Sequence, residues 1–262
     1  DASGISYEVD QQNAAGDTPT CTTIAQKFVN DGDDLIFAIA TPAAQACAAE
    51  TEEIPIVLTG VTDPAGSGLV DTNEAPGGNV TGSSDLTPVA EQIDLLQQIL
   101  PEAKTVGILY CSAESNSEIQ AQLAHEACEA AGLTAVDYTV STSNDIQTVV
   151  ESMVGNVDAI YAPTDNIIAA GMPTVAMIAN ENKLPIIAGE EGMCNAGALA
   201  TYSIDYKELG KVAGEMAVQI LTEGTSPAEM PIEYYPSEML QLVVNEETAA
   251  ELGIDVAGIT LE

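Results

Sequence analysis

Polar side chains that could bind a ligand or catalyse a reaction gather where short apolar runs end. Five apolar runs share this pattern: Leu35–Ala40, Ile54–Val61, Val106–Tyr110, Ala159–Ala162 and Leu184–Ala188. The polar tips that follow them are, in the same order, Thr41-Pro42, Thr62-Asp63-Pro64, Ser112 to Ser117, Thr164-Asp165-Asn166 and Glu190-Glu191. Runs that are apolar on both faces are typical of parallel sheets covered by helices, and such sheets bind ligands beyond the carboxyl ends of their strands. The tips are therefore the expected site.

Catalysis at these tips is disfavoured by the residue types. Nucleophilic catalysis by serine or cysteine needs a base, and the only histidine, His125, falls within a helical pattern away from the tips. A glycosidase pair or a hard-cation site could use carboxylates, but the chain has no tryptophan and two phenylalanines for stacking on a sugar. No glycine-rich phosphate-binding motif follows a strand. We expect no enzyme, no cofactor and no metal.

Binding of a zwitterion suits the same tips. Helix N-termini after Thr41 and Ser117 offer N–H groups and a positive dipole end for a carboxylate. Acids such as Asp63, Asp165 or Glu190 suit an ammonium group. For any single tip residue the alternative is an ordinary helix N-cap. Together the tips predict a receptor for an amino acid, with a sugar as the main rival because Asp and Asn also pair with hydroxyls.

The sequence contains no arginine, and this limits which groups can bind the charged ends of the ligand. A ligand carboxylate is expected on backbone N–H groups and hydroxyls, and the ammonium is expected on Asp165 or Asp205, with Glu190 as a further candidate. The candidate ligand-binding residues are Thr41, Pro42, Thr62, Asp63, Ser84, Asp85, Ser115, Asn116, Ser117, Thr164, Asp165, Asn166, Glu190 and Asp205.

Composition limits the class of protein. The 262 residues are 46% hydrophobic and carry a net charge of −36, from 41 acids against five lysines. A chain of this length can bury two medium-sized cores, so two lobes are expected. The negative field repels phosphates, which disfavours binding to nucleic acid or to a membrane surface. An acidic, solvated surface is typical of an extracellular or high-salt setting.

The chain alternates between expected strands and helices, and this gives an α/β fold with two Rossmann-like lobes. The expected strands are Ile5–Gln11, Leu35–Ala40, Ile54–Val61, Val106–Tyr110, 133–140, 157–162, 184–188, Ala198–Tyr202 and Gln241–Asn245. The expected helices are Pro19–Asn30, Pro42–Glu50, Val89–Leu100, 117–131, 144–154, 167–182 and Tyr206–Thr222. Residues 66–78 are expected to form a glycine-rich loop.

The five cysteines cannot all pair within the chain, and none has metal-ligand spacing. Cys21 and Cys47 are expected on neighbouring helices, either as a disulfide or as two buried thiols. Cys111 and Cys194 lie near strand tips and are either free or paired with each other. Cys128 is expected in the core.

Several stretches together resemble one protein family. They are Ala38 to Gln45, Val61 to Pro64 with Gly68 to Val70, Pro76 to Asp85, Pro163 to Asn166, Gly189 to Gly192, and Tyr202 to Tyr206 with Leu209 and Gly210. This linked set is similar to the tryptophan/tyrosine-type substrate-binding proteins of ABC transporters, and the likeness covers essentially the whole chain.

The resemblance implies a type I periplasmic-binding-protein fold, with three crossovers that form a hinge and a ligand, most often an aromatic amino acid, in the cleft between the lobes. Residues 1–84 plus 204–233 would form the N-terminal lobe, and residues 85–203 plus 234–262 the C-terminal lobe. Family members also begin with a strand and helix ahead of the segment that matches Ile5–Gln11.

The resemblance further implies an extracytoplasmic monomer that works with the permease subunits of an ABC importer, attached to a membrane only through a lipid anchor outside this sequence. A binding protein for a sugar or nucleoside, or the ligand-sensing domain of a larger receptor, is the alternative.

Overall fold

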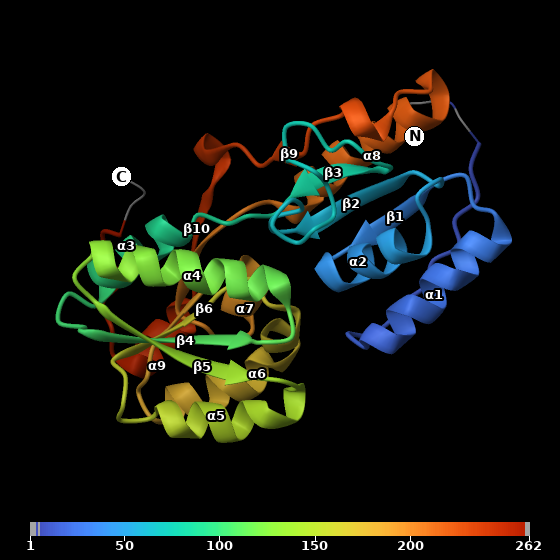
Figure 1. Ribbon diagram of the computed structural model, residues 1–262. Helices are drawn as coiled ribbons and strands as arrows, with labels where there is room; N and C mark the ends of the chain where they lie inside the picture. Colours follow the sequence, from blue (N-terminus) through green and yellow to red (C-terminus); the bar gives the residue numbers. More distant parts are fainter. Residues whose placement is uncertain (1–3, 5, 260–262) are drawn as a thin grey trace. The chain divides into compact units, whose positions relative to one another are not determined.

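The computed structural model describes residue 4 and residues 6–259, which form two compact units (Figure 1). Unit 1 comprises Asp1–Leu86 and Tyr206–Tyr235, and unit 2 comprises Thr87–Asp205 and Pro236–Glu262. The chain therefore passes between the units three times, near residues 86, 205 and 235.

Unit 1 is built on a parallel sheet of four strands in the order β1-β2-β3-β9. The strands are β1 (Ile36–Ile39), β2 (Ile56–Val61), β3 (Val80–Ser84) and β9 (Glu233–Tyr234). Strand β3 is polar, and sequence analysis missed it. Its side chains are satisfied inside the unit, because Thr81 donates a hydrogen bond to the Met230 carbonyl (2.7 Å) and Ser83 donates one to the Thr59 hydroxyl (3.0 Å).

Helices cover both faces of this sheet. Ile56 and Leu58 of β2 pack in one cluster with α1 (Thr18–Asp31) and α2 (Thr41–Glu50). Val57, whose side chain points to the opposite face, packs against α8 (Tyr206–Glu223). The expectation that helix 206–222 packs with residues 1–84 is thus confirmed, since α8 lies on β2 and β3.

The expected strand over Ile5–Gln11 is wrong for residues 6–11, which form no strand, while Ile5 lies outside the described residues. Tyr7 and Val9, whose alternation suggested the strand, are 64% and 70% exposed. A strand is stable only when neighbouring strands satisfy its backbone, and β1 ends the sheet on the side away from β2. The alternating pattern finds no strand partner among the described residues.

Unit 2 contains a sheet of six strands in the order β10-β8-β7-β6-β4-β5. They are β4 (Thr105–Cys111), β5 (Thr134–Val140), β6 (Ala159–Ala162), β7 (Ile186–Ala188), β8 (Ala200–Ser203) and β10 (Gln241–Val244). All neighbours run parallel except β10, which is antiparallel to β8. Because β10 pairs with β8, strand 241–245 returns to this unit as expected.

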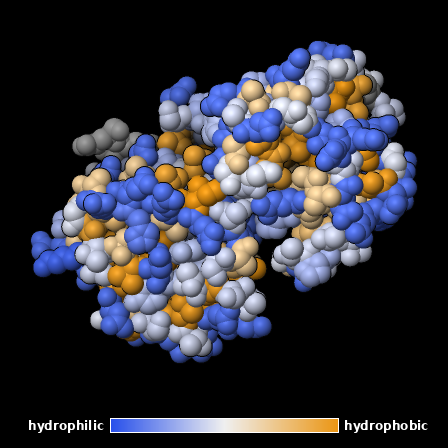
Figure 2. Space-filling view, viewed as in Figure 1, coloured by the Kyte–Doolittle hydropathy of each residue, from blue (hydrophilic) through white to orange (hydrophobic). Residues whose placement is uncertain are grey.

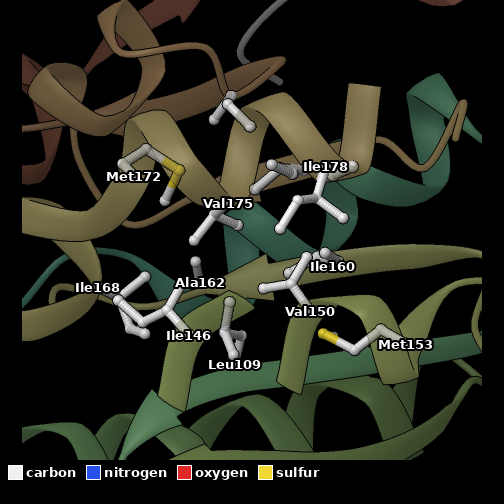
Figure 3. Packing of buried hydrophobic residues seen from close by; sticks show 14 of the residues in the cluster. Leu109, Ile146, Val150, Met153, Ile160, Ala162, Ile168, Met172, Val175 and Ile178 are labelled. Carbon is white, nitrogen blue, oxygen red and sulfur yellow. The ribbon is translucent and has the colours of Figure 1, made fainter. Parts of the chain in front are cut away.

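The helices of unit 2 lie on both faces of its sheet. They include α3 (Val89–Ile99), α4 (Ser115–Ala130), the short helix η1 (Ser143–Asp145), α5 (Ile146–Met153), α6 (Asn166–Glu181), α7 (Glu191–Asn195) and α9 (Glu246–Leu252). On one face Val150 of α5 and Val175 of α6 pack against Ile160 of β6 (Figure 3). On the other face α3 and α4 cover Ile108 and Tyr161. Two buried faces explain why the strands read as continuous apolar runs.

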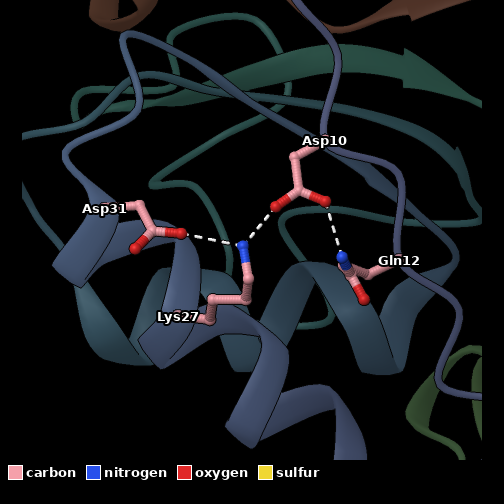
Figure 4. A network of polar contacts seen from close by, with 4 residues as sticks. All are labelled: Asp10, Gln12, Lys27 and Asp31. Carbon is pink, nitrogen blue, oxygen red and sulfur yellow. Dashed lines mark hydrogen bonds and ion pairs between the residues drawn. The ribbon is translucent and has the colours of Figure 1, made fainter.

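The surface is strongly polar. Hydrophilic side chains cover much of the face seen in Figure 2, with hydrophobic ones in scattered patches. Within unit 1, Lys27 bonds to the carboxylates of Asp10 and Asp31, and Asp10 also accepts from Gln12 (Figure 4). The carboxylates of Asp10 and Asp31 raise the pKa of the Lys27 ammonium. In turn, the hydrogen bonds that Asp10 accepts from Lys27 and Gln12 lower the pKa of Asp10.

All five cysteines are buried and free. Of the two alternatives for Cys21 and Cys47, the pair of buried thiols is therefore confirmed, and Cys111 and Cys194 are free rather than paired with each other. Cys21 and Cys47 behave as small hydrophobic side chains in one core cluster, and Cys128 lies in the core of unit 2 as expected. Among the described residues, no group of three or more His, Cys, Asp or Glu is arranged to hold a metal ion. No helix in the described ranges is both long and apolar enough to cross a membrane.

Candidate functional site

In unit 2 the strand order brings three polar tips side by side. Strands β7, β6 and β4 are consecutive neighbours and run parallel, so the segments after Ala188, Ala162 and Cys111 emerge at one edge of the sheet. Gly189 allows a close approach of two of these tips. A Cβ atom at this position would lie 2.4 Å from the backbone nitrogen of Thr164. Only glycine therefore fits there without moving the Thr164 tip.

Asp165 is buried at this edge and accepts hydrogen bonds from three different segments of unit 2. Its side chain is 2% exposed, and its Oδ1 accepts the backbone N–H of Ile168 (2.8 Å), which caps α6. Its Oδ2 accepts the backbone N–H of Cys111 (2.6 Å) and the hydroxyl of Ser117 (2.7 Å). Both carboxylate oxygens are thus used inside the protein, and they join the tip of β6 to the tip of β4 and the first turn of α4.

Burial raises the pKa of Asp165, and the nearby carboxylate of Glu114 raises it further, while the three hydrogen bonds lower it. Within the described part of the chain, no lysine or histidine forms an ion pair with either acid. Two neighbouring acids therefore lie buried without a counter-charge, which costs free energy until a cation approaches.

Glu114 is the second acid of this pair, and sequence analysis missed it. It is 6% exposed and occupies the N-cap position of α4 without capping the helix through its side chain. Its Oε2 accepts three bonds: from the backbone N–H of Asn166 (3.2 Å), from the Asn166 side-chain amide (2.7 Å) and from the Asn116 side-chain amide (3.2 Å). Its other oxygen, Oε1, accepts no hydrogen bond from any described residue.

Asn116, at the second position of α4, also has an unused acceptor. Its amide nitrogen lies within hydrogen-bond distance of Glu114 Oε2, Ser117 Oγ (3.2 Å) and the Thr164 carbonyl (3.3 Å). Its Oδ1 is buried without any hydrogen-bond partner. Asn116 is 3% exposed, and a buried acceptor with no partner is costly in a native protein.

Thr164 is held in place by Gln120, which sequence analysis also missed. The side chain of Gln120 donates to the Thr164 carbonyl (3.0 Å) and accepts from the Thr164 hydroxyl (2.7 Å). Gln120 is fully buried and sits one turn into α4. Neither Glu114 nor Gln120 stands out in the sequence, because both follow the strand tip as ordinary members of a helix start.

Glu190, the tip residue after β7, serves its own helix. Its carboxylate accepts the backbone N–H groups of Gly192 (2.5 Å) and Met193 (2.6 Å), so it is the N-cap of α7. Among the residues that the structure describes, no hydrogen bond joins Glu190 to Asp165 or Glu114. Glu190 is therefore an ordinary helix N-cap, which is the alternative that the sequence left open for each tip residue.

In unit 1 the tip of β1 leads into an uncapped helix start. Thr41 is 2% exposed and begins α2, with Pro42 in its first turn and no side-chain cap. Ala40, just before it, has φ 75° and ψ 151°, a backbone conformation that costs a non-glycine residue about 1–3 kcal/mol. Strained backbone of this kind clusters at ligand sites, and the free N–H groups of a helix start suit an anion.

The other polar tips of unit 1 divide into two groups. Thr62 donates to Asp85 (3.4 Å), Tyr206 donates to the other oxygen of Asp85 (3.2 Å), and Ser84 donates to the Thr62 carbonyl (2.6 Å). Asp63 does not join them. It accepts from the backbone of Gly66 (3.0 Å) and from Asn73 (2.9 Å), so it stabilises its own loop.

The structure thus gathers most of the predicted site residues within each unit. In unit 2 one hydrogen-bonded network contains Asn116, Ser117, Thr164, Asp165 and Asn166, next to Ser115 in the same helix turn. Asp205 follows β8 and is half-buried. His125, expected within a helix away from the tips, lies on α4 and contacts Asp137 (2.7 Å).

Comparison with known proteins places this geometry in a family. The family model described as ABC transporter substrate binding protein matches residues 2–261. The chain belongs to this family. As expected from the resemblance, its two α/β units with parallel sheets have the type I periplasmic-binding-protein fold.

Three relatives of this substrate-binding protein are informative. The tyrosine-binding protein of Clostridioides difficile strain R20291 is 43% identical over 95% of this chain and 71% of its own length. An ABC domain from Streptococcus pneumonia, solved in complex with L-Trp, is 39% identical with a TM-score of 0.92, over 95% of this chain and 86% of its own. A ligand-free, open substrate binding protein with adhesive properties from Clostridium difficile is 44% identical with a TM-score of 0.71, over 97% and 85%.

Proposed function

We propose that this substrate-binding protein captures a free aromatic amino acid, tyrosine or tryptophan, at the carboxyl ends of its parallel strands. The observation that carries the proposal is the pair of relatives near 40% identity, one named for binding tyrosine and the other solved with L-Trp. Each of them matches 95% of this chain.

The chemistry of the strand tips supports an amino acid as the ligand class. In unit 2, the buried acids Glu114 and Asp165 lack a cationic partner among the described residues, which favours a positively charged ligand group. The ammonium of an amino acid is such a group. Separately, the uncapped start of α2 at Thr41 in unit 1 offers N–H groups that suit an anion such as a carboxylate.

The remaining candidate residues are proposed as the surroundings of this ligand. Ser115, Asn116, Ser117, Thr164 and Asn166 shape the unit 2 tips, and Pro42, Thr62, Ser84 and Asp85 shape those of unit 1. Asp63, Glu190 and Asp205 remain candidates with roles at the margin, since Asp63 and Glu190 are engaged in their own loop and helix start.

A sugar is the weaker candidate. A periplasmic solute binding protein from Actinobacillus succinogenes with bound D-allose has the same fold, but it is 16% identical to this chain, and that likeness concerns the fold alone. Sugars are neutral, so they would leave the charges of Glu114 and Asp165 without a partner.

We further propose that the protein works outside the cytoplasm, delivers its ligand to the permease subunits of an ABC importer and performs no chemistry on it. Its family supports this role. The one histidine, His125, is paired with Asp137 on the surface and is not placed to serve as a base for a nucleophile at the tips.

Calorimetry with ligand-free protein tests the proposal. The protein is unfolded and refolded to remove bound ligand, and it is then titrated with each of the twenty amino acids and with a panel of sugars and nucleosides. Micromolar or tighter binding of tyrosine or tryptophan is expected. Tight binding of a sugar or nucleoside with no amino-acid binding would refute the proposal, and recovery of an altered ligand would refute the absence of catalysis.

A further inference from the structure

Unit 2 contains two unused acceptor oxygens at the start of α4, on side chains that share a hydrogen bond. Glu114 Oε1 accepts nothing from the described residues, and Asn116 Oδ1 is buried without a partner. The two side chains are joined by the bond from the Asn116 amide to Glu114 Oε2 (3.2 Å). Both side chains are more than nine-tenths buried.

We propose that Glu114 Oε1 and Asn116 Oδ1 form the seat of a primary ammonium group, and that Asp165 positions this seat without touching the ligand. The inference rests on the proposed function, and it names the residues that distinguish an amino acid from analogues that lack the amine.

The two acceptor oxygens of the seat explain why it needs a cation. A primary ammonium carries three N–H donors and no acceptor, so it satisfies unpaired carboxylate and amide oxygens together. A neutral hydroxyl would satisfy one acceptor and leave the carboxylate charge uncompensated. A ligand carboxylate would repel Glu114 at this short range.

Asp165 differs from Glu114 in having no oxygen to spare. Its three bonds, to Ile168, Cys111 and Ser117, fix the tip of β6 and the first turn of α4, where Asn116 precedes Ser117. Its negative charge adds to the field at the seat, but its contacts are internal. This assignment gives the ammonium to Glu114, where the sequence alone had favoured Asp165 or Asp205, with Glu190 as a further candidate.

The substitution Glu114→Gln tests the contribution of the seat's negative charge to binding. The amide oxygen of glutamine replaces Oε2 as acceptor for the Asn166 and Asn116 bonds, while the amide nitrogen places a donor where Oε1 was an acceptor. The hydrogen-bond network is retained, and the ammonium loses its charged partner. Glu118→Gln, an exposed acid one turn further along α4, removes the same charge as a matched control.

The experiment measures the affinity of each variant for L-tyrosine and for 3-(4-hydroxyphenyl)propionate, which lacks the amine. We expect Glu114→Gln to weaken binding of tyrosine by about 10- to 100-fold, the range for one hydrogen bond to a charged group. Binding of the propionate is expected to stay the same or improve. Glu118→Gln should change neither affinity, and Asn116→Leu should weaken tyrosine more than the propionate.

Other outcomes distinguish a failure of the proposed ammonium seat from a failure of the proposed function. Equal weakening of both ligands by Glu114→Gln would overturn the seat, while tyrosine binding by the unaltered protein would leave the proposed function standing. If the unaltered protein binds no amino acid but binds another primary amine, such as tyramine, and Glu114→Gln weakens that binding, the seat stands and the proposed function fails. Failure to bind any amine would overturn both.

Discussion

Replacement of Asp165 by alanine tests whether this acid stabilises the fold or binds the ligand directly. The change removes the N-cap of α6, which is worth about 1 kcal/mol. It also leaves the buried backbone N–H of Cys111 and the Ser117 hydroxyl without their acceptor, at about 1–3 kcal/mol for a buried donor. Loss of a buried charge offsets part of this cost, because burial raises the pKa of Asp165.

The expected net loss for Asp165→Ala is about 2–4 kcal/mol of unfolding free energy, or a fall in melting temperature of roughly 5–15 °C for a chain of this size. The assay is thermal and urea unfolding of the ligand-free protein. Asp165→Asn keeps a capping oxygen and should lie between alanine and the unaltered protein. Asp94→Ala, an exposed acid on α3, is the control and should change stability by less than about 0.5 kcal/mol.

One result would refute this reasoning. If Asp165→Ala is as stable as Asp94→Ala while its affinity for tyrosine falls at least about tenfold, the three internal hydrogen bonds contribute little and Asp165 contacts the ligand.

Three further predictions concern strain, charge and pH. Ala40→Gly should raise the unfolding free energy by about 1 kcal/mol in urea titrations, because glycine adopts φ 75° without a Cβ penalty; a loss of stability would show that Ala40 is not strained. Raising NaCl from about 0.05 M to about 1 M should raise the melting temperature, since salt screens repulsion within a chain of net charge −36; no rise would contradict this account. Asp158→Asn should destabilise the protein at neutral pH, because bonds from the backbone N–H groups of Lys104 and Thr105 lower the pKa of Asp158 below its usual 3.8. That difference should disappear as the pH falls through the lowered pKa, where Asp158 is protonated in the folded state as well, and a difference independent of pH would refute the assignment.

The apolar runs were sufficient to predict most of the fold. Strands buried on both faces are continuous in hydrophobicity, and β4, β6 and β7 were found within two residues of their observed ends. Strand β3 was missed because its polar residues Thr81 and Ser83 bond to atoms distant in the sequence, Met230 and Thr59. The strand over Ile5–Gln11 was wrong for the opposite reason, since its alternating pattern has no neighbouring strand to pair with in the described part of the chain.

The sequence by itself determined where polar side chains collect, because the tips of parallel strands follow from local hydrophobic pattern and helix-start chemistry. It also determined the family, through linked motifs. Only the tertiary structure decided which acid has an oxygen to spare. Hydrogen bonds from Cys111 and Ser117, about fifty residues away, occupy Asp165, while Glu114 keeps Oε1 open. Such long-range contacts depend on how strands and helices pack, and no local pattern encodes them.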